Sequence, residues 1–129
     1  MNSDPMYSVV AIIQPFMLEQ VVDALRLLTN FPGMSVSELR GFGRRCAHAP
    51  HRGERTEVEP FEDKVRIEIY CRDAEMKPIM DTIRRTARTG NDGDGKIFVS
   101  PLTKVVRIRT GEEGADALLC GHPVDNAHG

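Results

Sequence analysis

A glycine-rich segment, residues 89–99, carries the residue types that bind anions. It reads Thr-Gly-Asn-Asp-Gly-Asp-Gly-Lys-Ile-Phe-Val, and most of it matches a Walker A phosphate loop. The match fails at Ile97, where that motif needs a serine or threonine for magnesium. Gly93 and Gly95 would still let backbone N–H groups approach a phosphate, and Lys96 adds a positive charge. The alternative is a glycine-rich turn with a surface lysine.

Two further basic segments strengthen the case for an anion site. On a strand over residues 105–109, Arg107 and Arg109 would point the same way, roughly 7 Å apart. Two guanidinium groups and a lysine together suit polyphosphate, although salt bridges to Glu68 or to the acidic tail are an alternative. Residues 41–45, Gly-Phe-Gly-Arg-Arg, form a glycine-framed hinge after a predicted strand. Three basic, glycine-bearing segments beside strand ends indicate anion binding more strongly than any one alone.

The composition excludes several classes of protein. The 129 residues carry a formal net charge of −2, with five Phe, two Tyr and no Trp, so nucleic acid is not an expected partner. The chain lacks an apolar run near the ~20 residues that cross a bilayer, and its start lacks the features of a signal peptide. Three widely spaced cysteines argue against a disulfide framework. We therefore expect a cytoplasmic protein with no redox cofactor and no membrane insertion.

The hydrophobic pattern predicts an α+β domain of the ferredoxin-like, split βαβ type, with two helices on one face of an antiparallel sheet. Residues 44–62 lack periodicity and are predicted to form a long flexible loop. Asp73 is predicted to cap the second helix and Gly90 to end it. The domain is predicted to span residues 1–118, followed by a tail over 119–129. The predicted strands are 7–13, 34–40, 64–71, 96–99 and 104–109, and the predicted helices are 18–28 and 73–87.

The first predicted strand, residues 7–13, is apolar on both of its faces. Two helices cover only one face of the sheet, so the other face needs a second cover. The sequence therefore predicts a homo-oligomer.

From about Ser8 to Leu118, the sequence resembles the PII signal-transduction family (nitrogen regulatory protein P-II). This resemblance implies a trimer of ferredoxin-like subunits with ATP or ADP bound between neighbours. The long loop would be the family's T-loop, which inserts into a target protein such as a transporter, an enzyme or a transcription factor. The resemblance implies a regulator rather than an enzyme, and the sequence offers no nucleophile–base pair for turnover. It rests on the stretches at residues 11–16, 41–44, 64–69, 89–99 and 107–112.

The resemblance also assigns roles by position. Residues 41–44 and 93–96 would form one wall of the nucleotide cleft, and Arg107 and Arg109 would reach the phosphates across the subunit interface. Ser35 and Glu68 would lie near the base or sugar. The residues predicted to bind ligand are Ser35, Gly41, Phe42, Gly43, Arg44, Arg45, Lys64, Glu68, Gly93, Asp94, Gly95, Lys96, Arg107 and Arg109.

Three departures from the family pattern affect the predicted ligand and its control. Gln14 replaces a lysine, and Arg45 replaces the glutamine that holds 2-oxoglutarate with magnesium. Arg45 cannot coordinate magnesium but can bind a carboxylate directly, so 2-oxoglutarate, bicarbonate (with Lys64) and other small anions stay open, as does magnesium. The loop has no tyrosine that could be nucleotidylylated.

A Cys/His group in the loop supports an alternative function. The opening of the chain is similar to a PII offshoot associated with heavy-metal efflux systems. Cys46, His48 and His51 could bind zinc or copper, and the chain would then be a metal-responsive binding module. Their spacing matches no closed structural zinc pattern. Cys120, His122 and His128 in the tail are further candidate ligands.

Overall fold

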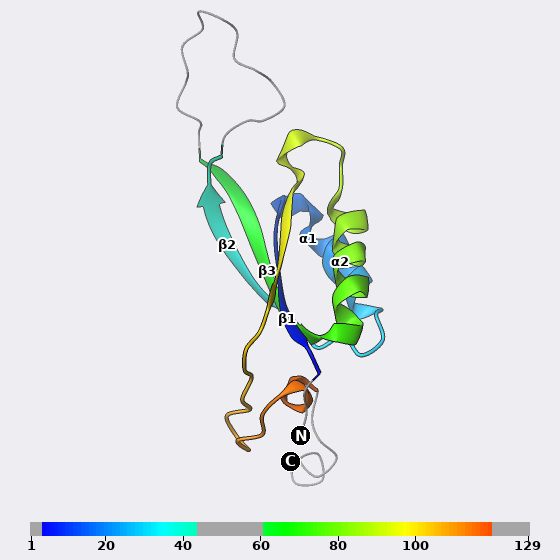
Figure 1. The fold of residues 1–129 in the computed structure, drawn as a ribbon. Coiled ribbons are helices and arrows are strands. Elements are labelled where there is room, and N and C mark those ends of the chain that lie inside the picture. Colours follow the sequence, from blue (N-terminus) through cyan, green and yellow to red (C-terminus); the bar gives the residue numbers. More distant parts are fainter. Residues whose placement is uncertain (1–3, 44–60, 120–129) are drawn as a thin grey trace, which may run out of the picture.

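A computed structural model describes residues 4–43 and 61–119 as a sheet with two helices on one side (Figure 1). The four strands are antiparallel to their neighbours, in the order β2-β3-β1-β4. This arrangement confirms the predicted ferredoxin-like fold. The strands are β1 (Met6–Ile13), β2 (Ser35–Gly41), β3 (Glu62–Arg72) and β4 (Gly95–Pro101), and the helices are α1 (Leu18–Arg26) and α2 (Asp73–Ala87). Three short 3-10 helices complete the described chain: η1 (Pro15–Met17), η2 (Asp92–Asp94) and η3 (Ala115–Leu118).

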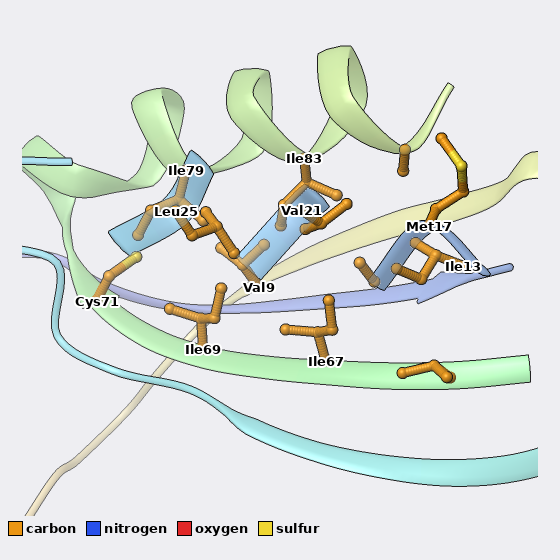
Figure 2. Packing of buried hydrophobic residues seen from close by; sticks show 13 residues of the cluster. Val9, Ile13, Met17, Val21, Leu25, Ile67, Ile69, Cys71, Ile79 and Ile83 are labelled. Carbon is orange, nitrogen blue, oxygen red and sulfur yellow. The ribbon is translucent and has the colours of Figure 1, made fainter. Parts of the chain in front are cut away.

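The core lies between the helices and the sheet (Figure 2). Alternate residues of β3, including Ile67 and Ile69, point to the helices, as the period of two in a strand requires. The helices contribute residues four apart, such as Val21 and Leu25 of α1, which face the sheet together. Burying each of these side chains contributes about 1.5–3 kcal/mol, so this layer stabilises the scaffold on which the polar residues sit.

The other face of the sheet carries no helix in the described residues (Figure 1). The strand register places Val10 of β1 between Glu68 of β3 and Phe98 of β4 on this face. Phe98 is 52% exposed and Tyr70 is 42% exposed. These aromatic side chains agree with a face that another copy covers, which stays a prediction.

The ends of α2 differ from the prediction. Asp73 is the first helical residue rather than the cap, and its N–H donates to the carbonyl of Pro5 at 2.9 Å. Arg72 is the capping residue, and its backbone N–H donates to Glu75 Oε1 at 3.0 Å. The helix ends at Ala87, and the next residue is extended, so Gly90 does not end it. The hydrogen bonds between Arg72 and Glu75 therefore cap this end of the helix in place of an aspartate.

Residues 104–109 do not form the predicted strand. Val106 makes a single bridge to Glu113, and the chain turns back sharply between them. The Arg107 N–H donates to the Glu112 carbonyl at 2.8 Å, and the Gly111 N–H donates to the Arg107 carbonyl at 2.7 Å. The sequence of this segment alternates as a strand does, but the described chain offers it no neighbouring strand.

No helix within residues 4–43 and 61–119 has the length and apolar character to cross a membrane.

Candidate functional site

Several predicted site residues meet at one end of the sheet, which we call the upper end (Figure 1). β1 and β2 finish here, and β3 and β4 begin here, because neighbouring strands are antiparallel. Ile13 at the end of β1 pairs with both Val65 and Gly95, and Gly41 at the end of β2 pairs with Glu62. The hinge, the start of β3 and the glycine-rich segment are thus brought together by the sheet itself.

A lysine links two of these segments directly. The Lys64 ammonium donates a hydrogen bond to the Gly93 carbonyl at 3.0 Å and lies 3.6 Å from the Glu62 carboxylate. A Cβ on Gly93 would lie 2.5 Å from Gln14 Nε2, so Gln14 touches the glycine-rich segment as well. Sequence reasoning noted Gln14 as a departure from the family but did not place it in the site. Its position directly after β1 was the available signal.

Asp94 closes the glycine-rich segment on itself. Its carboxylate accepts hydrogen bonds from the Thr89 N–H at 2.7 Å, from the Gly90 N–H at 2.8 Å, and from the Thr89 hydroxyl. The hydroxyl bond and then the backbone N–H bonds hold the pKa of Asp94 below its usual value. Asp94 therefore holds the loop in shape, and its charge is directed at the loop's own backbone.

Gly95 is required by the geometry of the sheet. Its φ of +104° lies in the region that L side chains rarely adopt, and an added Cβ would lie 1.8 Å from the Ile12 carbonyl oxygen. The close approach lets β4 begin directly against β1. This places the backbone of Lys96 beside Ile12, its partner in the register.

The hinge after β2 is held by aromatic contacts. The rings of Phe42 and Phe61 meet edge to face, with centroids 4.9 Å apart. The Arg40 guanidinium carbon lies 5.4 Å from the centroid of the Phe61 ring. The two chain ends that flank residues 44–60 are thereby joined. Arg44 and Arg45 lie outside the described residues.

Arg107 makes contacts within its own segment. Its guanidinium lies 3.1 Å from the Glu112 carboxylate and donates to the carbonyls of Leu119 at 2.8 Å and Asp116 at 3.2 Å. The expectation that Arg107 and Arg109 share one strand face is wrong, because residues 104–109 do not form a strand. Arg107 instead forms a salt bridge with Glu112, one of the acidic residues that follow Arg109 in the sequence. Arg109 is exposed.

Ser35 and Glu68 are direct partners in the register of β2 and β3. The Glu68 carboxylate accepts hydrogen bonds from Arg66 Nε at 2.6 Å and from the Tyr70 hydroxyl at 3.2 Å. Burial and then the bond to Glu68 raise the pKa of Tyr70. Ser35 is six strand residues from Gly41, a distance of roughly 20 Å along the sheet.

The predicted residues therefore form two groups in one chain. The upper group lies at the start of β4 and the end of β2. The lower group includes Arg107 and Arg109, near the opposite end of the sheet, where the Leu102 N–H donates to the Met6 carbonyl (Figure 1). The structure brings the members of the upper group together and pairs Ser35 with Glu68, but it does not bring Lys96 and the two arginines together in a single chain. The upper group is Gly41, Phe42, Gly43, Lys64, Gly93, Asp94, Gly95 and Lys96, and the lower group is Ser35, Glu68, Arg107 and Arg109.

The metal candidates Cys46, His48, His51, Cys120, His122 and His128 lie outside the described residues. Residues 4–43 and 61–119 contain no group of three or more His, Cys, Asp or Glu side chains that could hold a metal ion. Cys71 is buried in the core, and burial, followed by the charges of Glu75 and Asp73, raises the pKa of its thiol to about 11. Its sulfur is thus protonated and enclosed at neutral pH.

Comparison with known proteins agrees with the fold. Residues 6–112 match the family described as "Nitrogen regulatory protein P-II". The chain is 46% identical over 114 residues to the Nitrogen regulatory protein P-II of Bradyrhizobium diazoefficiens and 44% identical to that of Azospirillum brasilense. In each case the match covers 88% of this chain and 100% of the relative.

Solved structures agree as well. The GlnK–ATP complex of B. subtilis superposes with a TM-score of 0.76 at 29% identity, covering 89% of this chain and 99% of that one. Arabidopsis thaliana PII bound to citrate superposes with a TM-score of 0.68 at 37% identity, covering 89% of this chain and 94% of that one. With this fold, this coverage and these identities, the chain belongs to the nitrogen regulatory protein P-II family.

Proposed function

We propose that this P-II family member binds ATP or ADP in clefts between neighbouring subunits of a homotrimer. One observation carries the proposal: the predicted phosphate-binding residues form two groups near opposite ends of one subunit (Figure 1). A phosphate that meets both groups must lie between two copies. The similarity to GlnK in its complex with ATP supports the choice of nucleotide.

In this proposal, each subunit contributes to two nucleotide sites: its upper group to the site shared with one neighbour, and its lower group to the site shared with the other. The upper group contributes the Lys96 ammonium and the backbone N–H groups of the glycine-rich segment, whose shape depends on Asp94 and Lys64. The lower group of the neighbour contributes the Arg109 guanidinium, with Arg107 holding its segment folded through Glu112. Ser35 and Glu68 of the lower group would lie near the base or sugar. Charge-assisted hydrogen bonds to phosphate supply most of the affinity.

The bound nucleotide regulates a partner and is not turned over, in our proposal. The Glu68 carboxylate already accepts hydrogen bonds from Arg66 and Tyr70, which leaves it poorly placed to act as a general base. The loop between β2 and β3 would then contact a transporter, an enzyme or a transcription factor in the cytoplasm. The contact between Phe42 and Phe61 would transmit changes at the nucleotide site to the base of this loop.

Isothermal titration calorimetry with ATP and ADP tests the proposal. We expect Arg109→Ala to weaken both affinities about tenfold or more, because each lost charge-assisted contact costs ~1.5–3 kcal/mol. Arg26→Ala is the matched control, since Arg26 is an exposed arginine at the end of α1, outside both groups. ATP and ADP affinities that are the same in Arg109→Ala as in the unsubstituted protein would contradict the assignment.

Metal sensing is a separate proposal that rests on residues 46–51 and on the similarity to the efflux-associated offshoot. Titration with Zn²⁺ compares the unsubstituted chain with the triple variant Cys46→Ser, His48→Ala, His51→Ala. Stoichiometric zinc binding that the triple variant loses would support a metal-responsive module. Equal zinc binding by both proteins would contradict it.

A further inference from the structure

A groove of about 400 Å³ lies between the C-terminal half of α2 and the start of β4, on the helix side of the sheet. Its floor is apolar and is built by Ile83 and Ala87 of α2 with Ile13 and Ile97 from the strands. A volume of this size suits a small organic ligand. The groove is separate from the open face of the sheet, where Ser35 and Glu68 lie.

Two arginines line the rim of this groove. Arg84 lies on α2 four residues after Met80, and Arg88 directly follows the last helical residue, Ala87. Lys96 also lines the groove, but the alternation along β4 places its side chain with that of Phe98 on the open face of the sheet, opposite to Ile97. Within residues 4–43 and 61–119, neither arginine has an ion-pair partner.

The single acid that lines the groove offsets only part of the charge of the two arginines and forms no ion pair with either of them. The Asp94 carboxylate accepts hydrogen bonds from the Thr89 and Gly90 N–H groups and from the Thr89 hydroxyl. The groove therefore combines an apolar floor with a positive rim. Its complement is an organic anion with an apolar body.

We propose that this groove binds a small soluble organic anion, with an apolar chain or ring on the floor and a phosphate or carboxylate between Arg84 and Arg88. The guanidinium groups would hold the headgroup by charge-assisted hydrogen bonds. The proposal does not depend on nucleotide binding. It does place a second ligand on the other side of the glycine-rich segment, which both sites would share.

Cations near the end of a helix are also favoured by the helix dipole, which gives a simpler reason for these arginines. The dipole would favour Arg85 in the same way, and Arg85 is exposed and adjacent in sequence but does not line the groove. Arg85 therefore separates the two explanations.

The test is a titration of the full chain with hexyl phosphate in the presence of saturating ADP. The NMR signals of the isoleucine and methionine methyl groups report binding at each step. Inorganic phosphate and hexanol supply the headgroup and the chain separately. We expect saturable shifts at Met80, Ile83 and Ile97 with hexyl phosphate, and a response at least tenfold weaker with either fragment. We expect the double variant Arg84→Gln, Arg88→Gln to weaken binding about tenfold or more and Arg85→Gln to change it less than twofold.

Several results would overturn the proposal. These are the absence of saturable shifts at the floor methyls, an equal loss in Arg85→Gln, and shifts confined to residues 89–95. A repeat titration without ADP gives the same floor shifts if the proposal holds. If nucleotide binding itself fails, the titration without ADP still decides whether the groove binds its ligand.

Discussion

The ammonium group of Lys64 donates to the backbone carbonyl of Gly93 at 3.0 Å, across a separation of 29 residues. This contact joins the start of β3, which follows the long loop, to the segment predicted to bind phosphate. The Lys64 side chain is only 15% exposed, so water cannot readily replace its partners. The bond gives a physical route between the proposed nucleotide site and the loop.

Replacing Lys64 should therefore cost more stability than replacing an exposed lysine. We expect Lys64→Met to lower the free energy of unfolding by about 1–2 kcal/mol, since a hydrogen bond from a charged group is lost. Lys77→Met is the control, because its pair with Asp81 is exposed on α2 and worth about 0.3–0.5 kcal/mol. Urea unfolding at one fixed protein concentration measures both. Equal effects would show that the Lys64 bond contributes nothing special.

Gly95 should tolerate no side chain. Gly95→Ala combines an unfavourable φ with a Cβ 1.8 Å from the Ile12 oxygen, and we expect a loss of about 3 kcal/mol or more. Gly111→Ala separates the two effects, because Gly111 has a φ of +78° and open space around it. We expect it to cost about 1–2 kcal/mol. Thermal unfolding of the two variants in parallel checks the order, and similar losses would show that the steric contact is relieved.

The bonds to Asp94 predict how the glycine-rich segment responds to acid. The pKa of Asp94 is lowered in the folded protein, chiefly by the Thr89 hydroxyl, so the stabilisation is complete above the ordinary value of 3.8. It is lost as the pH falls through the folded-state pKa. We expect hydrogen-exchange protection of the Thr89 and Gly90 amides to be constant between about pH 5 and 8 and to fall only below about pH 4. Asp94→Asn should reduce the protection at every pH. An Asp94 carboxyl that titrates above 3.8 by NMR would contradict this.

Arg45 predicts a weak response to 2-oxoglutarate. An arginine cannot coordinate magnesium, so we expect little magnesium-dependent synergy between ATP and 2-oxoglutarate in the unsubstituted chain. Arg45→Gln should increase that synergy, with Arg26→Gln, at the exposed end of α1, as the control for lost charge. Calorimetry with ATP, Mg²⁺ and 2-oxoglutarate measures the coupling. Tight ATP-dependent 2-oxoglutarate binding by the unsubstituted chain would contradict the prediction.

The regular elements could be predicted because their patterns are local. Val65, Ile67 and Ile69 alternate along β3, and Val21 and Leu25 recur at helical spacing, so the strands and helices that form the core follow from the sequence. The segment at residues 104–109 has the same alternation but lacks a neighbouring strand. A strand depends on its partner, and no local pattern reveals whether that partner exists.

The candidate site could be predicted in its residues but not in its geometry. The glycine-rich segment and the two arginines were found from their residue types. Their division between two ends of the subunit follows from the order of the strands. Likewise, the contact of Gly93 with Gln14 joins segments that are far apart in the sequence. The hydrogen bond from the Thr89 N–H to the Asp94 carboxylate depends on how the glycine-rich segment turns. These relationships exist only in the folded chain.

Mixed trimers test the central claim most directly, namely that each nucleotide site combines Lys96 of one subunit with Arg109 of its neighbour. Lys96→Ala and Arg109→Ala chains are purified separately, unfolded together and refolded, and ATP binding is measured by calorimetry. Each variant alone should bind ATP at least tenfold more weakly. Every trimer that contains both variants should regain one site of unsubstituted affinity, because one of its interfaces unites an intact Lys96 with an intact Arg109. Mixed trimers that regain no such site would contradict the claim.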